Sequence, residues 1–304
     1  MIDEISKAIE EVQYKLPKIK FRLLEPMKHH TSIKIGGPVR VMFFPSKPED
    51  MTDLYALLCE NGVKPFVMGK GTNLLVKDGT LELAVINTMG LNSLEHTGDM
   101  EISAGAGVLL SRLAETAHES GLAGLEFAHG IPGTLGGAVY MNAGAYGGEM
   151  KDVVHRTTVF RADTGVFYVT GDEHDFSYRH SRFTDSSDII ISSVLRLKKG
   201  DARTIKTKME ELETRRRVSQ PLDVPSAGSV FKRPKDGYAA SLIEQAGLMG
   251  YISGGAQVSE KHAGFIINRG GATFSDVMTV IEHIRETLLK QQGVELELEI
   301  RRLE

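Results

Sequence analysis

Hydrophobic side chains recur every three or four positions in several segments, a pattern that predicts amphipathic helices. The first helix is expected over residues 2–16, with one face made by Ile2, Ile5, Ile9, Val12 and Leu16. Further helices are expected over 48–61, 107–120, 239–246 and 276–290. A charged helix of about 17 residues is also expected to begin near Asp201.

Runs of β-branched and aromatic residues predict strands over 39–44, 65–68, 83–86, 101–104, 153–160, 165–170, 189–197, 263–267 and 294–301. In the last run, alternation places Glu295, Glu297 and Glu299 on one face, which is normally the solvent face of an edge strand. Composition changes at residues 198–201, so we expect a domain boundary there. The whole pattern predicts a mixed α+β protein with two or three lobes.

Composition excludes several classes of protein. The chain has 304 residues and a formal net charge of −4, so it lacks the basic field that nucleic acid or an acidic membrane would require. Cys59 is the only cysteine, which excludes an internal disulfide framework and a cysteine-rich metal site. The first residues are charged and no apolar run could span a bilayer, so we expect a cytoplasmic protein. His29-His30 lacks acidic or histidine partners at metal-ligand spacing, so we expect no bound metal ion.

Glycine is abundant, with 32 residues, and two glycine-rich loops are candidates for ligand binding. In Gly69–Leu75, small residues allow backbone N–H groups to form an anion-binding nest, to which Thr72 and Asn73 add side-chain donors. The loop lacks the third glycine of a dinucleotide fingerprint and the Lys-Ser/Thr pair of a P-loop. An ordinary glycine-rich turn is the alternative interpretation.

The second loop, residues 124–138, contains five glycines and one proline and does not fit a plain amphipathic helix. Backbone of this kind can press against a flat ring or a phosphate. The alternative is a close crossing of two elements, which also needs small residues.

Four motifs give the chain a family resemblance: Thr31-Ser32 with Gly36-Gly37, Gly69–Leu75, Gly130–Gly137, and Met141-Asn142-Ala143-Gly144. Their order and spacing over about residues 22–302 resemble the UDP-N-acetylenolpyruvoylglucosamine reductase family. The resemblance implies an α+β fold with an N-terminal helix (1–20), an FAD-binding domain of the PCMH/vanillyl-alcohol-oxidase type in two lobes (21–82 and 83–199), and a substrate-binding domain (200–304). Only about 20 residues separate Arg179 from the next long helix, so the chain resembles the compact form of the family.

The cofactors and substrate follow from the resemblance. It implies that Gly69, Lys70, Gly71, Thr72, Asn73, Leu74 and Leu75 line the FAD pyrophosphate, and that Gly130, Ile131, Pro132, Gly133, Gly136 and Gly137 lie along the flavin and its phosphates. Because Cys59 belongs to a helix and residues 69–75 contain no histidine, we expect non-covalent FAD. The implied reaction is the NADPH-dependent reduction of UDP-N-acetylglucosamine enolpyruvate to UDP-N-acetylmuramate in peptidoglycan precursor synthesis, carried out by a monomer.

Three residues match the catalytic positions of the family. Arg179 would hold the substrate carboxylate as an enolate develops. Ser229 would donate the proton, and Glu299 would help to stabilise or protonate the intermediate. Alternatives remain: Arg179 could pair with Asp172, Glu173 or Asp175, and the Ser229 hydroxyl could bind backbone in a turn. The sequence departs from the family at Leu298, where relatives often carry proline.

Substrate contacts are also implied by the resemblance, at Tyr178, Lys232, Arg233 and Gln257. Lys232 and Arg233 could meet the diphosphate of the sugar nucleotide or the phosphates of NADPH, although an exposed basic pair is the alternative. His262 could reach the ligand or could be an ordinary imidazole. Two rival functions are a flavin oxidase of the same fold and a flavin- or nucleotide-binding module without catalysis. The joint presence of the three catalytic positions argues against both.

Overall fold

The computed structural model describes residues 3–235 and 237–304, so Ile2 of the expected first helix lies outside the described residues. The chain divides into two compact units. The first comprises residues up to Leu23, Arg40–Lys70 and Leu83–Arg215, and the second comprises Leu24–Val39, Gly71–Glu82 and Arg216–Glu304. Loop 69–75 thus begins in the first unit and ends in the second. The domain boundaries expected near residues 21, 83 and 200 stay predictions.

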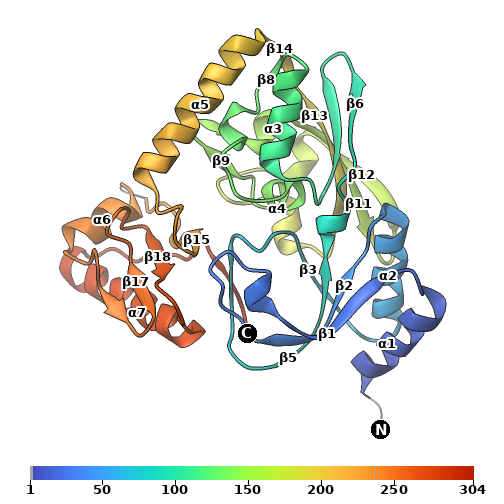
Figure 1. Ribbon diagram of the computed structural model, residues 1–304, viewed down its shortest axis with the longest axis horizontal. Helices are drawn as coiled ribbons and strands as arrows, with labels where there is room; N and C mark the ends of the chain where they lie inside the picture. Colours follow the sequence, from blue (N-terminus) through green and yellow to red (C-terminus); the bar gives the residue numbers. More distant parts are fainter. Residues whose placement is uncertain (1–2, 236) are drawn as a thin grey trace. The chain divides into compact units, whose positions relative to one another are not determined.

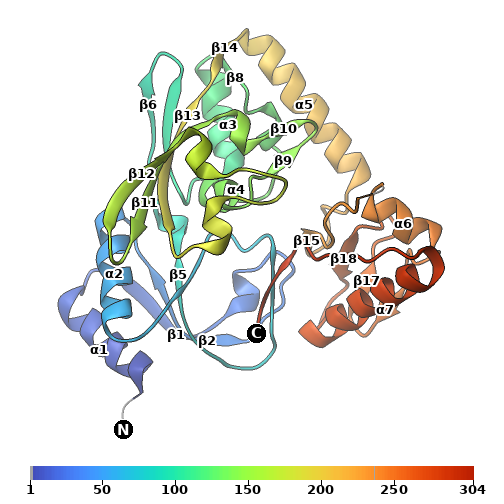
Figure 2. The same cartoon turned by 180° about the vertical axis from the view of Figure 1, so that it is seen from behind.

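The first unit contains a five-stranded antiparallel sheet in the order β12-β11-β13-β7-β6 (Figure 1), seen from behind in Figure 2. Its strands are β6 (Leu94–Gly98), β7 (Glu101–Gly105), β11 (Val154–Arg161), β12 (Gly165–Thr170) and β13 (Ile189–Arg196). Helix α4 (Leu135–Tyr140) packs on β13 and β7. The same unit holds α3 (Leu110–Glu119), β8 (Leu122–Ala123), β9 (Gly144–Ala145), β10 (Gly148–Glu149) and β14 (Lys198–Lys199).

A second sheet, most of which lies in the first unit, has the order β1-β2-β5-β3. Its strands are β1 (Lys20–Pro26), β2 (Pro38–Phe44), β3 (Phe66–Met68) and β5 (Leu81–Asn87). Helices α1 (Glu4–Lys15) and α2 (Pro48–Glu60) belong to the same hydrophobic core. Helix α2 begins at a proline, which is tolerated in the first turn, and is followed by Gly62 with φ of 76°.

The second unit is built on a small antiparallel sheet in the order β15-β18-β17-β16, with its own hydrophobic core. Its elements are β15 (Ser226–Ser229), α6 (Ala239–Gln245), β16 (Ile252–Ser253), β17 (Ala256–Val258), β18 (Phe265–Asn268) and α7 (Phe274–Gln292). A parallel pair, β4 (Leu74–Val76) and β19 (Arg301–Leu303), joins the first glycine loop to the end of the chain. Helix α5 (Ala202–Ser219) contains the point in the sequence, between Arg215 and Arg216, at which the chain passes from the first unit to the second.

Most of the expected elements are confirmed, but two differ. The helix expected from residue 107 begins at Leu110, because the backbone of Leu109 is extended, with a ψ of 138°. The strand expected over 294–301 is wrong: outside β19, an isolated bridge joins Leu298 to Phe231. Among the described helices, none has a stretch of sufficient length and apolarity to cross a membrane.

Candidate active site

The two glycine-rich loops meet within the first unit. Strand β3 ends at Met68, directly before Gly69. If residue 69 had a Cβ atom, that atom would lie 2.2 Å from the Oγ1 atom of Thr134. The loop that contains Thr134 is held by backbone hydrogen bonds, from Leu110 N–H to the carbonyl of Gly133 (3.1 Å) and from Gly136 N–H to the carbonyl of Ala106 (2.9 Å). Two segments of small residues that are more than 60 positions apart in sequence are therefore in contact.

The second loop is partly helical, since α4 begins at Leu135, directly after the extended residue Thr134. At Gly136 a Cβ would lie 2.9 Å from the Cβ of Ala106. A close crossing of two segments therefore explains this glycine, as the alternative interpretation of the sequence proposed. The side chain of Thr134 is buried beneath the same crossing.

The rest of the first loop, in the second unit, is tied to the end of the chain. Asn73 donates from Nδ2 to the carbonyl of Glu299 (3.0 Å) and accepts at its own carbonyl from Arg301 N–H (2.9 Å). The Gly71 carbonyl accepts from Ser32 N–H at 3.2 Å. A parallel pairing of β4 with β19 continues this contact. Asn73, expected at the FAD pyrophosphate, is therefore also the residue that fixes the backbone of Glu299.

Ser229 lies at the end of β15, opposite Phe265 of β18 and after a bulge at Gly228, whose φ is 81°. The next residue, Val230, accepts at its carbonyl from Glu299 N–H at 2.8 Å. Ser229 and Glu299 are 70 positions apart in sequence, but their backbones lie one residue apart across this contact. The second unit therefore brings two of the three expected catalytic residues together with Asn73.

The expected substrate-binding side chains of the second unit have protein partners. Lys232 Nζ lies 3.2 Å from Glu297 Oε2, and both groups are exposed. Arg233 donates from Nε to the Gly237 carbonyl (3.2 Å) and stacks on a tyrosine ring. Gln257 donates to the carbonyl of Gly250 at 3.3 Å. Burial lowers the pKa of His262, which favours a neutral imidazole.

Arg179 occupies a tight turn between β12 and β13 in the first unit. Ser177 and His180 exchange backbone hydrogen bonds of 3.1 and 3.2 Å across it. Arg179 has a φ of 55°, a left-handed conformation that favours glycine or asparagine. Its guanidinium donates to the Gly144 carbonyl (3.2 Å) and lies 5.0 Å from the centre of the Tyr178 ring.

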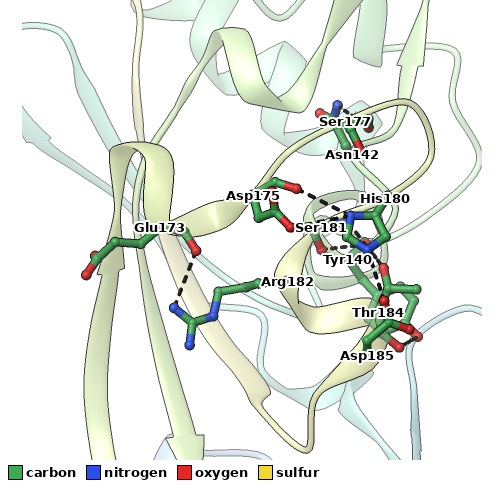
Figure 3. Close-up of polar contacts among 10 residues, drawn as sticks. All are labelled: Tyr140, Asn142, Glu173, Asp175, Ser177, His180, Ser181, Arg182, Thr184 and Asp185. Atoms are coloured by element: carbon green, nitrogen blue, oxygen red, sulfur yellow. Dashed lines mark hydrogen bonds and ion pairs between the residues drawn. The ribbon is translucent and has the colours of Figure 1, made fainter.

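A polar cluster surrounds this turn (Figure 3). The imidazole of His180 lies 3.1 Å from Asp185 Oδ2, and this hydrogen bond raises the pKa of His180 above its usual value. Ser181 donates from Oγ to the Tyr140 carbonyl at 2.7 Å, which ties the segment after the turn to the end of α4. The carbonyl of Glu173 accepts from Arg182 at 3.3 Å. Sequence reasoning identified Arg179 but missed this support, because the contacts join residues that no periodicity relates.

A buried histidine lies on the other side of the turn segment. His174 stacks on Phe176 with ring centres 4.8 Å apart, and its Nε2 atom lies 2.9 Å from the Thr157 hydroxyl. Burial lowers the pKa of His174, so the ring packs as a neutral group. Among the described residues, no three His, Cys, Asp or Glu side chains are placed to hold a metal ion.

Both parts of the chain resemble known protein families. Residues 39–170 match the family described as FAD binding domain, and residues 220–303 match the C-terminal domain of UDP-N-acetylenolpyruvoylglucosamine reductase. A solved structure of UDP-N-acetylenolpyruvylglucosamine reductase from Thermus caldophilus is 32% identical, with a TM-score of 0.80 over 94% of this chain and 99% of that one. The α+β fold class, with an FAD-binding part and a distinct C-terminal part, is confirmed.

The chain is an FAD-dependent oxidoreductase. Proteins named UDP-N-acetylenolpyruvoylglucosamine reductase are similar over nearly its whole length. The one from Caldanaerobacter subterraneus is 46% identical over 96% of this chain and 97% of its own length, and the one from a Thermotoga species is 47% identical over 92% of each. The chain belongs to the UDP-N-acetylenolpyruvoylglucosamine reductase family, which confirms the resemblance identified from its motifs.

Proposed function

We propose that this protein reduces UDP-N-acetylglucosamine enolpyruvate to UDP-N-acetylmuramate with NADPH as the reductant, in peptidoglycan precursor synthesis. The similarity to reductases of this name over nearly the full chain carries the proposal. The contacts of Glu299 with Val230 and Asn73 support it, because they join the residue that follows the expected proton donor, Ser229, to the expected cofactor loop. Monomeric state and cytoplasmic location stay predictions.

The residues of the first unit fit a bound FAD. A Cβ atom at position 69 would collide with the Thr134 hydroxyl, so the two expected cofactor loops can meet at this point because residue 69 has no side chain. The neighbouring His129 has a buried Nδ1 atom without a hydrogen-bond partner among the described residues, and such an atom is satisfied when a ligand supplies the partner. We propose that Gly69–Leu75 and Gly130–Gly137 hold the cofactor. When bound there, FAD would supply the chemistry of hydride transfer between NADPH and the enolpyruvyl double bond.

Arg179 is proposed to bind the substrate carboxylate. A guanidinium can hold a carboxylate through two parallel hydrogen bonds, and its attraction strengthens as negative charge moves into that group. Left-handed backbone in a non-glycine residue costs of order 1–3 kcal/mol and is found preferentially at functional sites. Arginine occupies position 179 although its left-handed backbone carries this cost, which supports a functional role for its side chain.

Ser229 is proposed to donate the proton from its Oγ atom to the substrate carbon, with Glu299 assisting. Ser229 lies directly before Val230, whose carbonyl accepts from Glu299 N–H, and this closeness of the two backbones supports the joint role. A carboxyl group nearby can supply a proton to the serine or stabilise developing charge. Tyr178, Lys232, Arg233 and Gln257 are proposed to contact the sugar nucleotide or NADPH, by exchanging their present partners for ligand.

A comparison of the two half-reactions tests these roles. Ser229→Ala should slow the reoxidation of reduced flavin by the enolpyruvyl substrate by at least about a hundredfold, the usual contribution of a positioned proton donor. Reduction of the same variant by NADPH should change little, as measured anaerobically by stopped-flow flavin absorbance. Equal slowing of both steps would remove Ser229 from the proton-donor role. Oxygen consumption with an alcohol substrate would favour the rival oxidase.

A further inference from the structure

Asn142 lies in the loop after α4, in the first unit, and its side chain is completely buried. Its Nδ2 group donates to the Ser177 carbonyl (3.0 Å) and to Glu149 Oε2 (2.9 Å), and its Oδ1 atom accepts from Lys151 N–H (2.9 Å). Both amide hydrogens and the amide oxygen are therefore used. Its φ of 41° is left-handed, a region in which asparagine is enriched among non-glycine residues.

The loop that begins at Asn142 contacts the Arg179 turn at two points. Ser177, whose carbonyl accepts from Asn142, is the first residue of that turn (Figure 3). Two residues after Asn142, the Gly144 carbonyl accepts from the Arg179 guanidinium. The base of the turn and the charged end of its arginine are thus held by the same three-residue segment, through the Asn142 side chain and the Gly144 carbonyl.

The chemistry of position 142 is demanding. Aspartate has nearly the same shape but no donor for the Ser177 carbonyl, and its charge would lie beside Glu149. Glycine adopts the left-handed backbone without cost but provides no side chain. Asparagine meets the backbone requirement and makes all three hydrogen bonds.

We infer that Asn142 is a positioning residue for Arg179: it holds the strained turn so that the guanidinium meets the substrate carboxylate. This inference rests on the proposed function of Arg179. Because the guanidinium must match a carboxylate to within a few tenths of an ångström, a displaced turn should lower catalysis without removing any group that touches the substrate.

The test compares Asn142→Asp and Asn142→Gly in the wild-type chain and in Arg179→Ala. In the wild-type chain we expect either substitution to slow flavin reoxidation by the enolpyruvyl substrate about a hundredfold. In Arg179→Ala the same substitutions should change that rate by less than about threefold, since the group they position is gone. Asn61→Asp is the control: it removes a donor at the end of α2, where Asn61 binds the Leu57 carbonyl at 3.0 Å, and should leave the rate unchanged.

Equal rate losses in both backgrounds, within about twofold, would overturn the inference and make Asn142 a merely structural residue. A wild-type rate in Asn142→Gly would also overturn it. The same six chains (the two backgrounds, each alone and with either substitution at 142) are compared by urea unfolding, where the effects of substitutions at 142 and 179 should be less than additive. If the wild-type protein does not reduce the sugar nucleotide, the proposed function fails, and additive unfolding effects would then refute the link between Asn142 and the turn independently.

Discussion

The left-handed backbone at Arg179 leads to a prediction that separates function from stability. Arg179→Ala and Arg179→Gly both remove the guanidinium, its hydrogen bond to Gly144 and its contact with Tyr178. The two variants differ mainly in how well they accept a φ of 55°. Both should lose the oxidative half-reaction, but Arg179→Gly should be the more stable protein.

The magnitude follows from two opposing costs. An L-residue in the left-handed region costs about 1–2 kcal/mol relative to its preferred conformations. Glycine avoids this cost but loses more backbone entropy on folding, by about 0.5–1 kcal/mol relative to alanine. The difference predicts that the free energy of unfolding of Arg179→Gly exceeds that of Arg179→Ala by up to about 1.5 kcal/mol.

Urea denaturation followed by circular dichroism at matched flavin content measures this difference, and stopped-flow reoxidation measures the catalytic loss. A more stable alanine variant would mean that the left-handed strain in the turn is smaller than the entropy cost of glycine, which would contradict the reasoning. Retention of the wild-type reoxidation rate in either variant would show that the carboxylate is bound by another group.

Three further predictions address other parts of the molecule. Gly69→Ala should weaken FAD retention at least about tenfold, measured by flavin fluorescence on dilution, because its methyl group would meet Thr134, and Thr134→Ala in the same chain should restore part of the affinity. The raised pKa of His180 means that its bond to Asp185 stabilises the fold below the unfolded-state pKa of about 6.5, a contribution lost as pH rises through the folded-state value. Asp185→Asn should therefore lower the His180 pKa in an NMR titration, and an unchanged pKa would contradict the hydrogen bond. Thr273→Ala removes the N-cap of α7 and should cost about 1 kcal/mol in unfolding free energy while kcat stays unchanged; a loss of activity would contradict a purely structural role.

Local patterns predicted the elements that depend on local physics. Helix α2 begins and ends where Pro48 and Gly62 indicate, and α5 begins close to Asp201. The segment before Arg301 shows the limit: Leu296 is buried as the alternation requires, but a strand also needs a partner, and the pairing available to Leu298 is one bridge to Phe231. Alternation reports which side faces the core and does not report whether a neighbouring strand exists.

The candidate site, like the fold, was predictable from the sequence only in part. Motif resemblance predicted catalytic roles for Arg179, Ser229 and Glu299, and these roles stay predictions, whereas residue spacing alone could not select Glu299 from the other glutamates beside it. The contacts that support the site were beyond prediction from sequence, because they are made by backbone atoms that carry no side-chain identity. The carbonyls of Val230 and Ser177 are examples, each bound by a residue far away in the chain.

Anaerobic oxidation of NADPH by the FAD-loaded protein, with and without UDP-N-acetylglucosamine enolpyruvate, tests the proposed function most directly. We predict that NADPH consumption stops after one flavin equivalent in the absence of the nucleotide. In its presence, consumption should continue until it matches the added nucleotide mole for mole, with UDP-N-acetylmuramate as the product. NADPH consumption that is indifferent to the nucleotide would contradict the reductase assignment and leave only a flavin-binding protein.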